Sequence, residues 1–286
     1  MNDEDFAALT RARCAGPGRP VEHRENGLLT DCTPRAPMPD QPLHPVSLYH
    51  LPSQAASPSL AERVALGGVD GSAGTVGLLA YDWEYLAPMR EGVVYAGSGG
   101  VVSAERFHDE DGELTHDDVA FSIELSDPAG TVVARITNHW RFRRVDGPTG
   151  GRPGRHEGSG EPIPGLTVGH VGVDRMKTKA ALLRDPYPVH WDPVALAAAG
   201  LGDRPINQGP LNVSYIANML MAWAGESALR RITVSFHGVV RDGDSVAAGG
   251  TVDDTVEVDG EQRHRCTVWL DRGDQRLVSG TAEVAV

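Results

Sequence analysis

The clearest periodic pattern of apolar and polar residues lies in the second half of the chain. Between residues 210 and 226, apolar side chains recur three or four positions apart, at Val213, Ile216, Leu220 and Trp223. This spacing places the side chains on one stripe of a helix. Pro210 suits the first position of a helix, because a proline there loses no intrahelical hydrogen bond. We therefore predict one long helix over this segment.

Strand patterns follow this helix up to the end of the sequence. In residues 231–240, Ile232, Val234 and Phe236 alternate with polar residues, which is typical of a strand with one buried face. The dipeptide Asp259-Gly260 predicts a tight hairpin turn. Further strands are expected at residues 245–258, 261–272 and 275–286. One helix followed by an antiparallel meander indicates an α+β unit.

The first half of the chain repeats this order in a weaker form. A short helix is expected at residues 57–68, where Ser57 suits the N-cap and Pro58 the first turn. Strands are then expected at residues 75–86, 92–107, 117–127 and 131–145. A helix and about four strands, occurring twice, predict two copies of one structural unit.

Two segments interrupt this pattern. Residues 1–30 are polar, contain glycine and proline and lack periodicity, so we expect a poorly ordered N-terminal tail. Residues 147–162 are rich in glycine and proline and nearly free of apolar side chains, which predicts a linker or a long surface loop. The two expected domains are therefore residues 31–146 and residues 163–286.

Composition and charge narrow the class of protein. The chain of 286 residues has a net charge of −13, which argues against a nucleic acid as the main partner. It has neither an apolar run as long as a membrane span nor the apolar core of a secretory signal, so a soluble cytoplasmic protein is expected. Its three cysteines match neither a disulfide framework nor a zinc site. The acidic segment 107–118 lacks the ligand spacing of a calcium or zinc site, so no metal is expected.

One short segment carries candidate chemistry. Residues 184–193, RDPYPVHWDP, place Asp185 five positions before His190 among three prolines. Alone, this segment is typical of a stiff turn with an aspartate cap. A histidine titrates near neutrality, and beside a carboxylate it can exchange protons with a bound water. The elements that follow along the chain decide between a structural turn and a catalytic pair.

Together with those elements, the segment resembles the MaoC-like (R)-specific enoyl-thioester hydratase and dehydratase family of the hotdog fold. The family's pattern of Asp, Pro and His is similar to Asp185, Pro188 and His190. An alanine-rich segment, a glycine-containing turn into the long helix and a strand pair then follow in the family's order. They lie at residues 192–202, 206–212 and 236–246.

This resemblance covers residues 163–286. It implies an α+β double hotdog, in which two antiparallel sheets, each wrapped around a central helix, pair as a pseudo-dimer. The first half of the chain resembles the degenerate hotdog that precedes the active one in two-repeat members, and it has no equivalent of the Asp and His pair. Catalysis is therefore expected in the second half.

The resemblance also implies a reaction. It is the reversible hydration of a trans-2-enoyl thioester, or the dehydration of a (3R)-hydroxyacyl thioester, so the protein would be a hydro-lyase. Asp185 and His190 would share the two proton transfers. The start of the long helix offers N–H groups to the thioester carbonyl. Because Pro210 has no N–H, the oxyanion donor is expected to be Gly209, as the resemblance also implies.

Two residues depart from the family pattern. Tyr187 occupies the position of an asparagine, and Gln208 stands where a histidine often precedes the helix glycine. Both are expected to bear on acyl specificity. The expected pocket lining is Tyr187, Asn207, Gln208, Asn212 and Ser214.

The acyl group would be carried by coenzyme A or by the phosphopantetheine of an acyl carrier protein, without a metal or redox cofactor. Arginines suit the phosphates of such a carrier, because the guanidinium matches phosphate geometry. The candidates are Arg230, Arg231 and Arg241, with Arg141, Arg143 and Arg144 as a second group. Two alternative functions stay open: a hotdog acyl thioesterase, and a non-catalytic acyl-binding partner subunit. A homodimer is also compatible with the sequence.

Overall fold

The computed structural model describes residues 3–11, 13–35, 42–49, 51, 73–144, 156–183 and 187–286. They fall into two units. The first comprises Met1–Pro20, Leu48–Ala87 and Val93–Pro153, and the second comprises Val21–Ser47, Pro88–Gly92 and Gly154–Val286. A short 3-10 helix, η1, spans Pro45–Tyr49. The helix expected at residues 57–68 and most of the expected linker lie outside the described residues.

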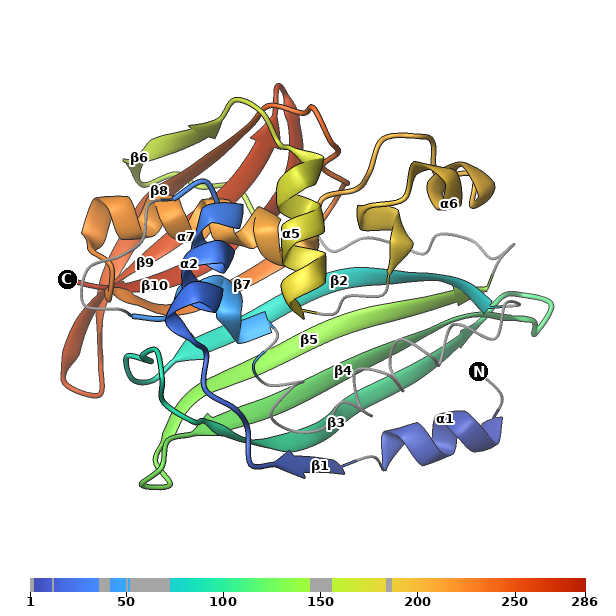
Figure 1. Ribbon diagram of the computed structural model, residues 1–286, viewed down its shortest axis with the longest axis horizontal. Coiled ribbons are helices and arrows are strands. Elements are labelled where there is room, and N and C mark those ends of the chain that lie inside the picture. The colour runs from blue at the N-terminus through green and yellow to red at the C-terminus, as the bar shows by residue number, and fades with distance from the viewer. Residues whose placement is uncertain are drawn as a thin grey trace. The chain divides into compact units, whose positions relative to one another are not determined.

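The first unit is built on an antiparallel sheet with the strand order β1-β3-β4-β5-β2 (Figure 1). Its strands are β1 (Arg13–Gly16), β2 (Ala73–Tyr85), β3 (Ala96–His108), β4 (Leu114–Ser126) and β5 (Val132–Arg144). The apolar side chains at alternate positions of β4 are buried, and Val119, Phe121 and Ile123 form a hydrophobic cluster with Val101 and Phe142. The four long strands agree with those expected from the alternation of apolar and polar residues.

The structure differs from the expected poorly ordered tail at residues 1–30. This segment contains α1 (Asp3–Thr10), β1 and α2 (His23–Cys32). Leu9 of α1 joins the hydrophobic cluster of the first unit, and Phe6 packs against it. Leu29 and Cys32 of α2 are buried in the second unit. Each helix has only two or three apolar side chains on one side, which is too few for a periodic signal in a mostly polar sequence.

The second unit is an antiparallel sheet with the order β7-β10-β9-β8-β6. Its strands are β6 (Glu161–Val168), β7 (Leu229–Phe236), β8 (Val246–Val258), β9 (Glu261–Arg272) and β10 (Gln275–Ala285). Asp259 and Gly260 form the two-residue turn between β8 and β9, with φ of 52° and 81°. Both values are positive, as the tight hairpin predicted from this dipeptide requires.

The central helix of the second unit is α7 (Gly209–Ala224), which packs on all five of its strands. The helix ends at Gly225, whose φ of 110° favours glycine and whose N–H donates to the Met221 carbonyl. Every residue from Pro210 to Met221 is buried. The sequence predicted one apolar stripe on this helix. In the structure α7 is covered on all sides, and its polar residues between Pro210 and Met221 are buried as well.

Three further helices of the second unit are α5 (Val173–Leu183), η2 (Pro188–His190) and α6 (Pro193–Ala198). The sequence did not predict α5, whose buried Met176 and Ala180 lie one turn apart between polar residues. Asp192 is the N-cap residue of α6, and its carboxylate accepts hydrogen bonds from the N–H groups of Val194 and Ala195. The helices α2 and α5, both in the second unit, pack against each other (Figure 1).

A buried polar network ties the segment around α2 to the middle of α7. The backbone N–H of Val46 donates to His44 Nδ1 over 3.0 Å, so the proton of the neutral imidazole sits on Nε2. Nε2 lies 2.8 Å from Asn218 Oδ1, and the Asn218 amide donates to the Thr33 carbonyl over 2.7 Å. The covering segment is thus held by directional bonds to the central helix, which explains why residues 21–47 belong to the second unit.

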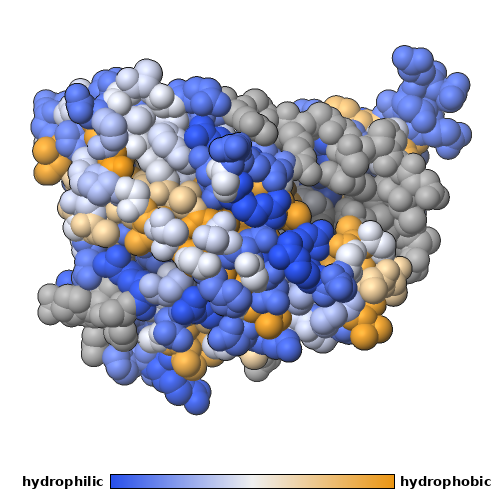
Figure 2. All heavy atoms as spheres, turned by 90° about the horizontal axis from the view of Figure 1, so that it is seen from above, coloured by the Kyte–Doolittle hydropathy of each residue, from blue (hydrophilic) through white to orange (hydrophobic). Residues whose placement is uncertain are grey.

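On the face of the molecule in Figure 2, hydrophilic side chains predominate and hydrophobic ones form small patches between them. In the part of the chain that the structure describes, no helix combines the length and apolar character needed to cross a membrane.

The His44 network makes stability depend on pH. Burial lowers the pKa of His44 from 6.5 to about 4, because the charged imidazolium is disfavoured inside the protein. The unfolded histidine binds a proton below pH 6.5, so this contribution to stability is complete above 6.5 and declines as the pH falls toward 4. His44→Gln, which keeps a donor and an acceptor, should remove about 2 kcal/mol of the stability change between pH 7.5 and pH 5. Urea unfolding at both pH values measures it; an unchanged pH dependence would contradict the buried neutral histidine.

Candidate active site

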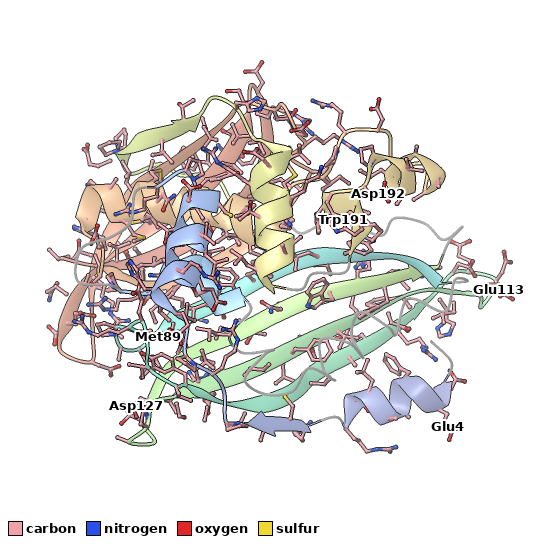
Figure 3. All side chains as sticks on the ribbon, viewed as in Figure 1. Glu4, Met89, Glu113, Asp127, Trp191 and Asp192 are labelled. Carbon is pink, nitrogen blue, oxygen red and sulfur yellow. The ribbon has the colours of Figure 1, made fainter. Side chains whose placement is uncertain are left out.

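The site begins at the tight turn that carries His190. Tyr187 precedes η2 with extended backbone angles, and Pro188 occupies the first turn. The N–H groups of Trp191 and Asp192 both donate to the Pro188 carbonyl, over 3.0 and 2.8 Å. Figure 3 marks Trp191 and Asp192, which lead from this turn into α6. The turn is closed by its own backbone, which fixes the position of the His190 backbone.

Two hydrogen bonds join this turn to the segment that enters α7. The Ile206 N–H donates to the Val189 carbonyl over 2.9 Å, and His190 Nδ1 lies 2.7 Å from the Ile206 carbonyl oxygen. A carbonyl oxygen only accepts, so Nδ1 must carry the proton. In the neutral ring Nε2 then has the lone pair, as a general base requires. The half-buried His190 is thereby held against Ile206, which lies three residues before the start of the helix.

The start of α7 is fixed in its turn to the strand region. Ile206 forms an isolated bridge with Arg241, and the Asn207 N–H donates to the Val240 carbonyl over 2.8 Å. Gln208 is the N-cap residue, and its carbonyl accepts the N–H groups of Leu211 and Asn212. The N–H groups of the first turn have no acceptor within a helix and carry its positive dipole end. Gly209 N–H belongs to this turn, where it suits an anionic or polarised oxygen.

The expected pocket residues divide into two groups. Ser214 is buried, and its hydroxyl donates to the Pro210 carbonyl over 2.7 Å, within the helix itself. Asn212 Oδ1 accepts from the Asn207 amide over 2.7 Å, and the same amide lies 3.3 Å from the Tyr215 hydroxyl. Burial raises the pKa of Tyr215 to about 12, so this phenol stays neutral. Asn212 and Ser214 thus support the helix start from inside.

Tyr187 and Gln208, the departures from the family pattern, flank the turn and the helix. The Tyr187 ring is half-buried and meets the His190 ring edge-on, with the ring centres 5.8 Å apart. Gln208 is almost fully buried, and its amide donates to the Met176 carbonyl of α5 over 3.0 Å. Sequence reasoning missed this role of α5, because its periodic residues are too few to stand out.

Asp185, the expected acid partner of His190, lies outside the described residues. Of the expected acid–base pair, the structure therefore describes His190 alone, which is bound to Ile206 ahead of α7. Among the residues that the structure describes, none of the His, Cys, Asp and Glu side chains gather in a group of three suited to a metal ion.

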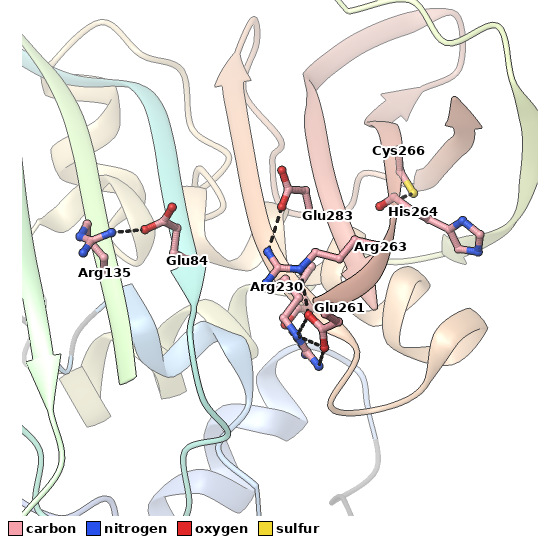
Figure 4. A network of polar contacts seen from close by, with 9 residues as sticks. Glu84, Arg135, Arg230, Glu261, Arg263, His264, Cys266 and Glu283 are labelled. Carbon is pink, nitrogen blue, oxygen red and sulfur yellow. Dashed lines mark hydrogen bonds and ion pairs between the residues drawn. The ribbon is translucent and has the colours of Figure 1, made fainter. Parts of the chain in front are cut away.

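The arginines expected to contact phosphate occupy different places. Arg230 donates to both carboxylate oxygens of Glu261, which also accepts from Arg263 (Figure 4). The positive charge of Arg230 is therefore paired with a carboxylate on the sheet. Arg231 stands opposite Glu283 in the pairing of β7 with β10. Of the second group, Arg141 is paired with Asp118. Arg143 and Arg144 lie at the end of β5.

Of the candidate arginines in the second unit, Arg241 is the one that adjoins the site. Its backbone bridges to Ile206, the residue whose carbonyl holds His190. Its guanidinium donates to the Arg204 carbonyl over 3.0 Å. Among the three arginines of the first group, this position makes it the one connected to the segment that enters α7.

Comparison with known proteins places this geometry in a class. A family model described as "MaoC like domain" matches residues 170–270, which contain the His190 turn, α7, β7, β8 and most of β9. No match was found among the curated proteins. Residues 170–270 are therefore a MaoC-like domain, and the resemblance read from the sequence is confirmed.

Solved structures extend the likeness to nearly the whole chain. A MaoC-like dehydratase from Phytophthora capsici is similar with a TM-score of 0.70 at 15% identity, over 100% of this chain and 98% of that one. A Mycobacterium tuberculosis protein described as having a double hotdog fold gives 0.64 at 11%, over 98% and 97%. Full-length peroxisomal multifunctional enzyme type 2 from Drosophila melanogaster gives 0.62 at 14%, over 96% of this chain and 48% of that one. The expected α+β double hotdog fold is confirmed.

Proposed function

We propose that the protein catalyses the reversible hydration of trans-2-enoyl thioesters, or the dehydration of (3R)-hydroxyacyl thioesters. The observation that carries the proposal is the 2.7 Å bond from His190 Nδ1 to the Ile206 carbonyl. It leaves the lone pair on Nε2 and ties the histidine to the segment that begins α7. The base at His190 Nε2 and the positive dipole end of α7 can then act on the same bound thioester.

Hydration joins the hydroxyl of water to C3 of the enoyl group and a proton to C2. His190 Nε2 takes up a proton from the water as its oxygen attacks C3, and Asp185 shares the return of a proton to C2. The negative charge that develops on the thioester oxygen is stabilised by Gly209 N–H at the start of α7. Dehydration runs through the same steps in reverse. No redox change occurs at any step, because water is only added or removed.

Coenzyme A and the phosphopantetheine of an acyl carrier protein both fit as the carrier of the acyl group. Each ends in the same thiol arm and bears a phosphate. Arg241 is the candidate for contact with that phosphate, because its backbone adjoins Ile206. The MaoC-like domain supports the class of reaction. The tautomer of His190 supports a base at Nε2, which hydration requires.

The catalytic pair is tested with crotonyl-CoA. His190→Ala and Asp185→Asn should each lower kcat for hydration by about 10²- to 10⁴-fold, the contribution of one general acid or base. Loss of the enoyl absorbance follows hydration, and a thiol reagent detects release of CoA. His170→Ala and Asp203→Asn are matched controls at exposed positions of the same unit and should keep wild-type rates. Full activity of both site variants would contradict the assignment, and thiol release in place of hydration would favour a thioesterase.

The oxyanion donor is tested at Gly209. Gly209→Pro removes one N–H, while Gly209→Ala keeps it. A proline fits the first turn of a helix, and Gln208 already has φ −63° and ψ 139°, which suit a residue before proline. We expect Gly209→Pro to lower kcat for crotonyl-CoA about 10²- to 10³-fold relative to Gly209→Ala. Circular dichroism and thermal unfolding check that both variants fold. Equal rates for two folded variants would exclude this N–H as the donor.

A further inference from the structure

One side of the buried helix α7 carries a stripe of polar side chains. Gln208, Asn212, Tyr215 and Asn218 are spaced by three or four positions, from the N-cap residue to the middle of the helix. Each is between 1% and 3% exposed. A buried polar atom without a hydrogen bond is costly, so each member of such a stripe needs a partner.

Most of the stripe finds its partners inside the second unit. Asn218 is bonded to His44 and Thr33. Asn212 and Tyr215 both accept from the Asn207 amide. These bonds account for the part of the stripe that lies under α2 and the segment after it.

The end of the stripe nearest the helix start is different. Asn207 Oδ1 and Gln208 Oε1 are buried and have no hydrogen-bond partner in the described structure. The orientation of the Gln208 amide is fixed, because its nitrogen donates to the Met176 carbonyl; the reversed amide would set two acceptor oxygens against each other. The Asn207 amide nitrogen donates to Asn212 Oδ1 over 2.7 Å and lies 3.3 Å from the Tyr215 hydroxyl, which leaves its Oδ1 as the second acceptor. Two acceptors therefore await donors that the described chain does not supply.

These two acceptors belong to the two residues that directly precede the expected oxyanion donor. Asn207 and Gln208 directly precede Gly209, and neighbouring Cα atoms are about 3.8 Å apart. They directly follow Ile206, whose carbonyl holds His190. A ligand whose carbonyl binds the Gly209 N–H thus has its acyl group in the neighbourhood of both oxygens.

We propose that Asn207 and Gln208 form an acceptor subsite for an acyl group that carries a hydroxyl beyond the reacting double bond. The proposal rests on the proposed function, since it places the acyl thioester at the start of α7. A hydroxyl donates one hydrogen bond to either oxygen, whereas an aliphatic chain of the same size leaves both without a donor and excludes water from them. The substrate class is therefore hydroxylated enoyl thioesters.

Matched pairs of substrates test this specificity. In each pair a terminal hydroxyl replaces a terminal methyl, as in 4-hydroxy-trans-2-butenoyl-CoA and trans-2-pentenoyl-CoA, and the panel continues with chains longer by one and two carbons. For at least one pair, kcat/KM should favour the hydroxyl about 10- to 100-fold, the discrimination expected from one buried hydrogen bond. Equal or lower values for the hydroxyl in all pairs would overturn the proposal and leave the two oxygens to bound water.

Variants assign the preference to the two amides. Gln208→Met and Asn207→Leu keep similar size and remove the acceptors, so each should bring the hydroxyl-to-methyl ratio of kcat/KM down toward one. Thr267→Val is a matched control, because this buried hydroxyl donates to Asp253 on the sheet, away from the helix start, and the ratio should not change. An unchanged ratio in both folded amide variants would also overturn the proposal. If neither variant folds, the wild-type panel decides.

A binding measurement separates this proposal from the proposed function. Ketone analogues of saturated acyl-CoA, with a methylene between the sulfur and the carbonyl carbon, have no double bond to hydrate and no thioester to hydrolyse. Calorimetric titration with the hydroxyl and methyl analogues should give Kd values that differ about 10- to 100-fold. This preference without hydration of any enoyl-CoA would support the subsite and refute the hydratase. Hydration without the preference would refute the subsite alone.

Discussion

The hydrogen bond between His190 Nδ1 and the Ile206 carbonyl is the constraint on which the site depends. It sets the ring tautomer and, with the bond from the Ile206 N–H to the Val189 carbonyl, joins the proline-rich turn to the segment that enters α7. The same segment is joined to the strand region through Asn207 and Val240. A histidine on a turn and the start of a buried helix thereby become one rigid site, although about twenty residues of sequence separate them.

Much of the second unit could be predicted from the sequence, because its signals are local. The alternation in β7 and the apolar spacing in α7 both follow from which side chains face the sheet core. The Asp259-Gly260 turn follows from the positive φ that both residues adopt. His190 and Gly209 could be singled out because their order along the chain resembles a known family. Asp185 belongs to the same resemblance, and its place stays a prediction.

What could not be predicted depends on contacts distant in sequence. The full burial of α7 results from α2, α5 and the His44 segment, which lie far from it along the chain. Their apolar residues are few, so periodicity does not reveal them. The roles of Asn212 and Ser214 are likewise set by neighbours: both looked like pocket residues, yet each bonds inside the helix start. Arg230 looked available for phosphate and is bound to Glu261. Polar residue types alone do not distinguish a ligand contact from an internal one.

The tautomer of His190 is the central claim, because the base, its orientation and its attachment to α7 all follow from it. Nuclear magnetic resonance of protein labelled with ¹⁵N in the histidine rings, recorded at a pH where the ring is neutral, measures it directly. The His190→Gln variant identifies the signals. We expect Nδ1 to give the resonance of a protonated nitrogen and Nε2 that of an unprotonated one. A protonated Nε2 with an unprotonated Nδ1 would mean that His190 does not bind the Ile206 carbonyl, and the site would need a different base.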